Sequence, residues 1–80
     1  MTPEATLRTR HDLPAVVAAA VRPDNTDEMT TRVAVSADGG DRVVETTISR
    51  DSTGGLRTTV DDYVTNLAVA DRLTDHDTQP

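Results

Sequence analysis

Apolar and polar residues alternate in three segments of the chain, and this alternation has the period of a half-buried β-strand. The first segment covers residues 4–10, the second residues 31–37 and the third residues 42–50. Two glycines at residues 39–40, flanked by aspartates, give the backbone the freedom that a hairpin turn needs. The pattern therefore predicts three strands, of which the second and third form a hairpin.

Helical spacing replaces this alternation between the first two strands. We expect Asp12 to cap the helix, because the amides of the first turn lack partners within it, and Pro23 to end it. The expected core stripe consists of Leu13, Val16, Val17, Ala20 and Val21. The opposite side, Ala15, Ala18 and Ala19, is also apolar, so we expect this helix to make contacts on two sides.

A second helix is predicted from Leu56 onwards, and it contains the only aromatic residue of the chain, Tyr63. Its expected core stripe consists of Leu56, Val60, Tyr63, Val64, Leu67 and Ala70. Val69 and Leu73 fall outside this stripe, because successive residues of a helix point about 100° apart. They therefore form a second, short apolar patch near the end of the helix.

The order strand, helix, strand, strand, helix predicts one small α+β domain over residues 4–74, followed by a polar tail over residues 75–80 that frays. A right-handed connection through the first helix makes the first two strands parallel and places the third strand between them. The expected sheet is three-stranded and antiparallel, with both helices on one face. The other face is polar and suited to water, and it carries Arg8, Arg10, Arg32, Glu45 and Thr47.

Composition limits how much this domain can bury. Only 35% of its 80 residues are hydrophobic, mostly Val and Ala, so the core is expected to be thin. There is no Lys, and the 8 basic residues stand against 14 acidic ones for a net charge of -6. Because concentrated salt screens the self-repulsion of such a chain, we expect a halophilic protein whose melting temperature rises with salt.

The location expected from the sequence is the cytoplasm. The chain has no Cys, so no disulfide framework indicates an oxidising compartment. Its first residues are polar and acidic, unlike a signal peptide, and no apolar stretch is long enough to cross a membrane. We therefore expect no membrane partner.

Residues that could carry chemistry are few. His11 and the Asp-His-Asp run at residues 75–77 do not supply the converging ligands that a metal site needs. The loop at residues 51–55 shares glycines with phosphate-binding loops but lacks their lysine. Asp61 and Asp62 point about 100° apart on a helix, so they are expected to be solvated charges. We predict no catalytic, cofactor or metal site, and no enzyme.

Two motifs carry a resemblance to a known family. Ala-Ala-Val-Arg-Pro-Asp-Asn closes the first helix at residues 19–25, and Gly-Leu-Arg-Thr-Thr-Val-Asp-Asp-Tyr-Val-Thr-Asn-Leu-Ala-Val-Ala opens the second at residues 55–70. With this spacing and element order, almost the whole chain resembles the Pcc family, the small dimerisation subunits of the KEOPS complex of archaea and eukaryotes. The family usually has Ser where this chain has Gly55, and here Ser52 or Thr53 is available as the cap instead.

The resemblance implies a KH-like fold and a non-catalytic function. Family members form dimers and bind, through their two helices, the sugar-kinase-like catalytic subunit that transfers a threonylcarbamoyl group to adenosine beside the anticodon of certain tRNAs. The chain is thus expected to be a homodimeric scaffold that contacts tRNA only indirectly or weakly. The residues expected to face the partner are Ala15, Ala18, Ala19, Arg57, Val69 and Leu73.

Two alternatives stay open. A free-standing KH-like module would bind RNA in a salt-sensitive way. Within a larger complex, a local basic strip across the sheet could contribute phosphate contacts, formed by Arg8, Arg10, Arg32, Arg42 and Arg50. Because the net charge is negative and Tyr63 lies on the core stripe, we expect these arginines to pair with acidic residues instead. A small enzyme is the weaker alternative, since no nucleophile with a matching base is apparent in the sequence.

Overall fold

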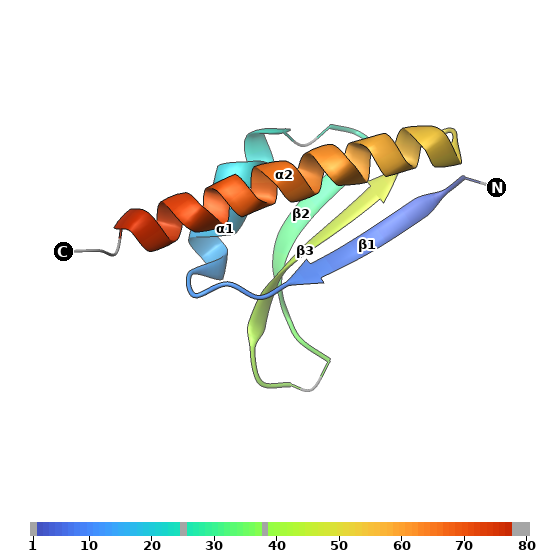
Figure 1. The fold of residues 1–80 in the computed structure, drawn as a ribbon. Coiled ribbons are helices and arrows are strands. Elements are labelled where there is room, and N and C mark those ends of the chain that lie inside the picture. Colours follow the sequence, from blue (N-terminus) through green and yellow to red (C-terminus); the bar gives the residue numbers. More distant parts are fainter. Residues whose placement is uncertain (1, 25, 38, 78–80) are drawn as a thin grey trace.

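Strands and helices follow one another in the predicted order (Figure 1). The computed structural model describes residues 2–24, 26–37 and 39–77. Its elements are β1 (Glu4–Thr9), α1 (Pro14–Val21), the 3-10 helix η1 (Arg22–Asp24), β2 (Met29–Val35), β3 (Arg42–Ser49) and α2 (Thr53–Asp77). Asn25 of the first motif and Asp38 of the predicted turn lie outside the described residues.

The three strands form one sheet in the order β1-β3-β2. Both outer strands run antiparallel to β3, so β1 and β2 are parallel to each other. The register places Thr46 of β3 between Leu7 of β1 and Thr31 of β2. The predicted α+β arrangement, with a three-stranded antiparallel sheet and the third strand in the centre, is confirmed.

Both helices cover the same face of the sheet (Figure 1). The buried core cluster combines residues of α1, β3 and α2, namely Val17, Ala18, Val21, Val44, Ile48, Tyr63, Leu67 and Ala70. Most of these side chains are small, and Tyr63 is the largest of them. The core is therefore as thin as the composition predicts, and contacts outside it carry more weight than in a larger domain.

Hydrogen bonds between hydroxyl groups run through the middle of this core. Thr31 and Thr46 approach to 3.0 Å between their Oγ1 atoms, and Thr46 donates to the phenol oxygen of Tyr63 at 2.5 Å. Burial raises the pKa of the Tyr63 phenol, because the charged phenolate is disfavoured away from water. These bonds satisfy polar groups that would otherwise be costly to bury, and they connect α2 to the sheet.

The buried side of α1 differs from the predicted stripe. Val17, Ala18 and Val21 are buried, whereas Leu13 and Val16 are 41% and 52% exposed. Ala20, also expected in the core, is exposed. Every residue of α1 is apolar, so hydrophobic periodicity cannot select a face, and the positions of α2 and the sheet decide which side is buried.

The helix starts also differ in part from expectation. The N-cap of α1 is Leu13, with no side-chain cap hydrogen bond, so the prediction that Asp12 caps this helix is wrong. Asp12 lies one residue too early, because Pro14 is already in the first turn. At the start of α2, Ser52 Oγ accepts a hydrogen bond from the Gly55 amide at 3.0 Å, so Ser52 supplies the cap.

Helix α2 is longer than predicted at both ends. It begins at Thr53 and continues to Asp77, so the part of the predicted tail at residues 75–77 is helical, while residues 78–80 lie outside the described chain. Its 25 residues span about 37 Å, and its C-terminal turns extend beyond the sheet (Figure 1). None of the described helices is long and apolar enough to cross a membrane.

Candidate partner-docking surface

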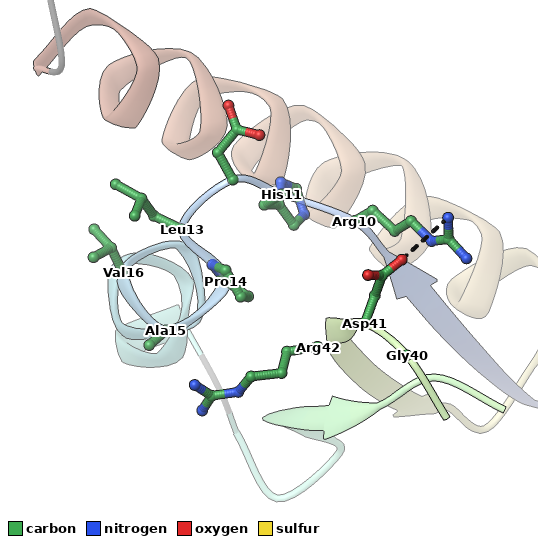
Figure 2. Close-up of a pocket in the computed structure, with 10 residues that line it drawn as sticks. Arg10, His11, Leu13, Pro14, Ala15, Val16, Gly40, Asp41 and Arg42 are labelled. Carbon is green, nitrogen blue, oxygen red and sulfur yellow. Dashed lines mark ion pairs between the residues drawn. The ribbon is translucent and has the colours of Figure 1, made fainter. Parts of the chain in front are cut away.

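Helix α1 presents an apolar side to water. Its sequence, Pro-Ala-Val-Val-Ala-Ala-Ala-Val, contains no polar side chain, and only Val17, Ala18 and Val21 are buried. We call the exposed remainder the outer face of α1, which consists of Leu13, Ala15, Val16, Ala19 and Ala20. Figure 2 shows Leu13 and Val16 pointing to the same side of the helix, away from the strands. A surface helix normally has polar residues at such positions, so this face suits contact with another molecule.

The C-terminal turns of α2 carry a second exposed apolar pair. Val69 is 47% and Leu73 is 60% exposed, and four residues of helix place them about 40° apart on one side. Val64, predicted to lie in the core, is 46% exposed. Because Val64 and Leu73 are nine residues apart, they lie on opposite flanks of α2, and Val64 does not extend the Val69 and Leu73 patch.

Four of the six residues predicted to face a partner lie on the two exposed apolar patches. Ala15 and Ala19 lie together on the outer face of α1, and Val69 and Leu73 are exposed on α2. Their placement leaves these four side chains exposed for contact with a partner.

Two of the predicted partner residues do not join this set. Ala18 is fully buried against the core, so its assignment to a partner-facing side is wrong. It sits between the sheet and α2, a position that helical spacing alone does not reveal. Arg57 is exposed but lies near the other end of α2, 16 residues and about 24 Å along the axis from Leu73.

A cleft of about 680 Å³ borders the outer face of α1 (Figure 2). Leu13, Ala15 and Val16 line one side of it, and residues of the β2–β3 hairpin line the other. Asp41 of the hairpin approaches Arg10 to 3.5 Å, and both side chains are well exposed. The outer face therefore ends at a charged rim, as is usual where an apolar contact patch meets water.

His11 forms a polar cluster that the sequence does not indicate. Its Nδ1 lies 2.6 Å from Oδ1 of Asp71, and its Nε2 lies 2.7 Å from Oγ1 of Thr9. When Nδ1 carries a proton donated to the carboxylate, Nε2 of the neutral ring accepts from the threonine hydroxyl. Asp71 is 60 residues away in the chain, so neither periodicity nor a local motif could have linked it with His11.

The order hydroxyl, imidazole, carboxylate also occurs in nucleophilic active sites, where the imidazole takes the hydroxyl proton. Thr9, however, belongs to the inner side of β1 and lines neither the cleft beside α1 nor a smaller cleft of about 400 Å³ beside β2. His11, but not Thr9, lines the cleft beside α1. The geometry is that of a structural connection between β1, the start of α1 and α2.

On the open face of the sheet, charged groups are paired with one another. Arg8 Nε donates to Oε2 of Glu45 at 2.7 Å, and Arg32 Nε donates to Oε1 at 2.8 Å. Hydrogen bonds from Arg32 and then Arg8 lower the pKa of the Glu45 carboxyl. Just beyond β3, on the side of α2, Arg50 approaches Glu28 to 3.5 Å and donates to Thr59. The prediction that sheet arginines pair with acidic residues is confirmed for Arg8, Arg10, Arg32 and Arg50.

Other candidate chemistry gains no geometric support. Among the described residues, no group of three or more His, Asp or Glu side chains could hold a metal ion. The side chains of residues 75–77 lie outside that description. Asp61 and Asp62 are exposed, as predicted for solvated charges.

No protein-family model, curated protein sequence or solved structure matches this chain. A function is therefore inferred from its own residues and their geometry.

Proposed function

We propose that this chain is a non-catalytic dimerisation and scaffold subunit of the KEOPS type, which binds a catalytic threonylcarbamoyl-transferase subunit through its helices. The observation that carries the proposal is the outer face of α1, an exposed helix side with no polar residue. The two sequence motifs that resemble the Pcc family, and the strand and helix order, support it further.

The outer face suits a helical partner. Its side chains are Ala and Val with one Leu, and small side chains let two helices approach closely. Burial of these groups removes apolar surface from water, at roughly 25 cal/mol per Å². In this proposal a second partner helix contacts Val69 and Leu73 of α2, which are 47% and 60% exposed.

Self-association belongs to a different part of the molecule in this proposal. Strands β1 and β2 form the two edges of the sheet, and each has one side without a strand neighbour. A second copy added at such an edge extends the sheet across a two-fold axis and leaves the helices free for the catalytic subunit. The acidic, lysine-free composition supports a place in the cytoplasm of a halophilic archaeon.

Co-purification at native salt, with a purified catalytic subunit as bait, tests the proposal. The double variant Val16→Asp with Ala19→Asp places two charges on the outer face and should weaken docking by about a hundredfold. Leu73→Asp should weaken it less. Val64→Asp is the matched control, because Val64 is 46% exposed on the flank of α2 opposite Leu73 and should bind like wild type.

Two results would contradict the proposal. Equal binding by the double variant and by Val64→Asp would exclude the outer face of α1 as the docking site. Tight, salt-sensitive RNA binding by the isolated chain, without any binding of the catalytic subunit, would favour the KH-like RNA-binding module instead. Circular dichroism of each variant shows whether a loss of binding reflects a loss of fold.

A further inference from the structure

The cluster of Thr9, His11 and Asp71 connects three parts of the fold. Thr9 ends β1, His11 belongs to the loop between β1 and α1, and Asp71 lies on α2 directly after the buried Ala70. The His11 side chain is 6% exposed and that of Asp71 is 39% exposed. A nearly buried imidazole is thus held on both ring nitrogens by groups from different elements.

The first turn of α1 lacks a side-chain cap, and the cluster lies directly before it. The N-cap residue Leu13 offers a backbone carbonyl to the amides of Val16 and Val17, but no side-chain cap. A missing cap costs a helix about 1 kcal/mol, and an eight-residue helix has little stability of its own. His11, two residues before the cap, instead connects the loop to β1 and to α2.

Hydrogen bonds between described side chains connect helix α2 to the sheet and to the loops beside it. Arg50 donates to Thr59, Thr46 donates to Tyr63, and His11 bonds to Asp71. The Asp71 contact is the one nearest the C-terminal turns that carry Leu73. Contacts between small apolar side chains are non-directional, whereas short hydrogen bonds fix a relative orientation.

We propose that the hydrogen bond between His11 and Asp71 is a latch that fixes the start of α1 and the C-terminal turns of α2 relative to each other, so that the two exposed apolar patches are held in a preformed arrangement for docking. His11 is then a positioning residue that does not touch the partner itself. The consequence for docking depends on the function proposed above, but the latch is a property of the isolated chain. A preformed surface loses less conformational entropy on binding than one that must first become ordered.

Amide hydrogen exchange of the full-length chain tests the latch without a partner. Asp71→Ala should speed exchange about tenfold or more at residues 12–17 and 68–73, while amides of β3 keep their protection. Asp61→Ala is the matched control, because it removes an exposed carboxylate from the same helix and should change nothing there. Asp71→Asn should retain most of the protection, since its amide oxygen still accepts from His11 Nδ1.

Docking to the catalytic subunit supplies the second measurement. Asp71→Ala should weaken binding about tenfold and Asp71→Asn should recover most of it, whereas Asp61→Ala should bind like wild type. Exchange that is equally slow in Asp71→Ala and Asp61→Ala overturns the latch. If exchange responds as expected but wild-type protein does not bind the catalytic subunit, the latch stands and the proposed function fails.

Discussion

The open face of the sheet and the outer face of α1 are both exposed, but they meet water in different ways. On the sheet, Glu45 holds Arg8 and Arg32 through short hydrogen bonds, and the hydroxyls of Thr6 and Thr47 lie 3.4 Å apart. The outer face of α1 has no polar side chain with which to make such bonds. The charged groups of the open face are hydrogen-bonded within the chain. The outer face of α1 instead leaves apolar side chains in water, and covering them would lower the free energy.

The two surfaces also differ in charge, because the sheet carries arginines and glutamate whereas the outer face of α1 carries no charged group. Arg8 and Arg32 of the open face hold Glu45, and beyond the strand ends Arg10 and Arg50 approach Asp41 and Glu28. The uncharged helix face is where a partner can lower the free energy most, through apolar burial.

The strongest test of the two sides of α1 is a pair of neighbouring alanines. Ala18→Asp introduces a carboxylate without a partner into the core, which costs several kcal/mol, a large share of the roughly 5–15 kcal/mol that stabilise a domain. Ala19→Asp exposes its charge to water and should cost about 1 kcal/mol or less. Thermal unfolding by circular dichroism should show Ala18→Asp unfolded and Ala19→Asp folded; two similar melting curves would contradict the assigned faces.

Two neighbouring valines test the same contrast between the buried and exposed sides of α1 with smaller changes in stability. Val17→Ala removes two buried methyl groups and leaves a small cavity, so it should lower the free energy of unfolding by about 2 kcal/mol. Val16→Ala, on the outer face, should change it by about 0.5 kcal/mol or less. Urea titration measures both, and equal losses would show that the two sides are not distinguished by burial.

Acid should weaken the open face of the sheet and leave the outer face of α1 unaffected. Arg32 and Arg8 lower the pKa of Glu45 from its ordinary value of 4.5, so the ionised carboxylate stabilises the fold above that value. This contribution is lost as the pH falls through the lowered pKa. Wild type should therefore exceed Glu45→Gln in stability at pH 7, and the difference should shrink well below pH 4.5. Urea titrations of the two proteins should differ at pH 7 and converge at the lower pH.

The smallest effect is expected at the rim of the cleft. Arg10 and Asp41 are 3.5 Å apart, with side chains 66% and 61% exposed, so Arg10→Ala should cost about 0.5 kcal/mol or less. Molar salt should remove even this difference, because exposed charges are screened. A loss above about 1 kcal/mol in urea titration would show that this rim pair does more than an ordinary surface contact.

The sequence by itself determined the order of the elements and the arrangement of the sheet. Alternation places Val44, Thr46 and Ile48 on one side of β3, and the structure buries all three. This succeeds because a strand has only two sides, and polar residues on one of them leave a single choice for the core.

Only the tertiary structure decided which side of α1 is buried and what His11 binds. Every side of that helix is apolar, so the buried residues are chosen by where α2 and the sheet lie, and Ala18 rather than Leu13 or Val16 enters the core. His11 meets Asp71 across 60 residues of chain, a contact that exists only once α2 has packed over the start of α1. Local pattern records periodicity, whereas burial and long-range hydrogen bonds depend on how the elements come together in space.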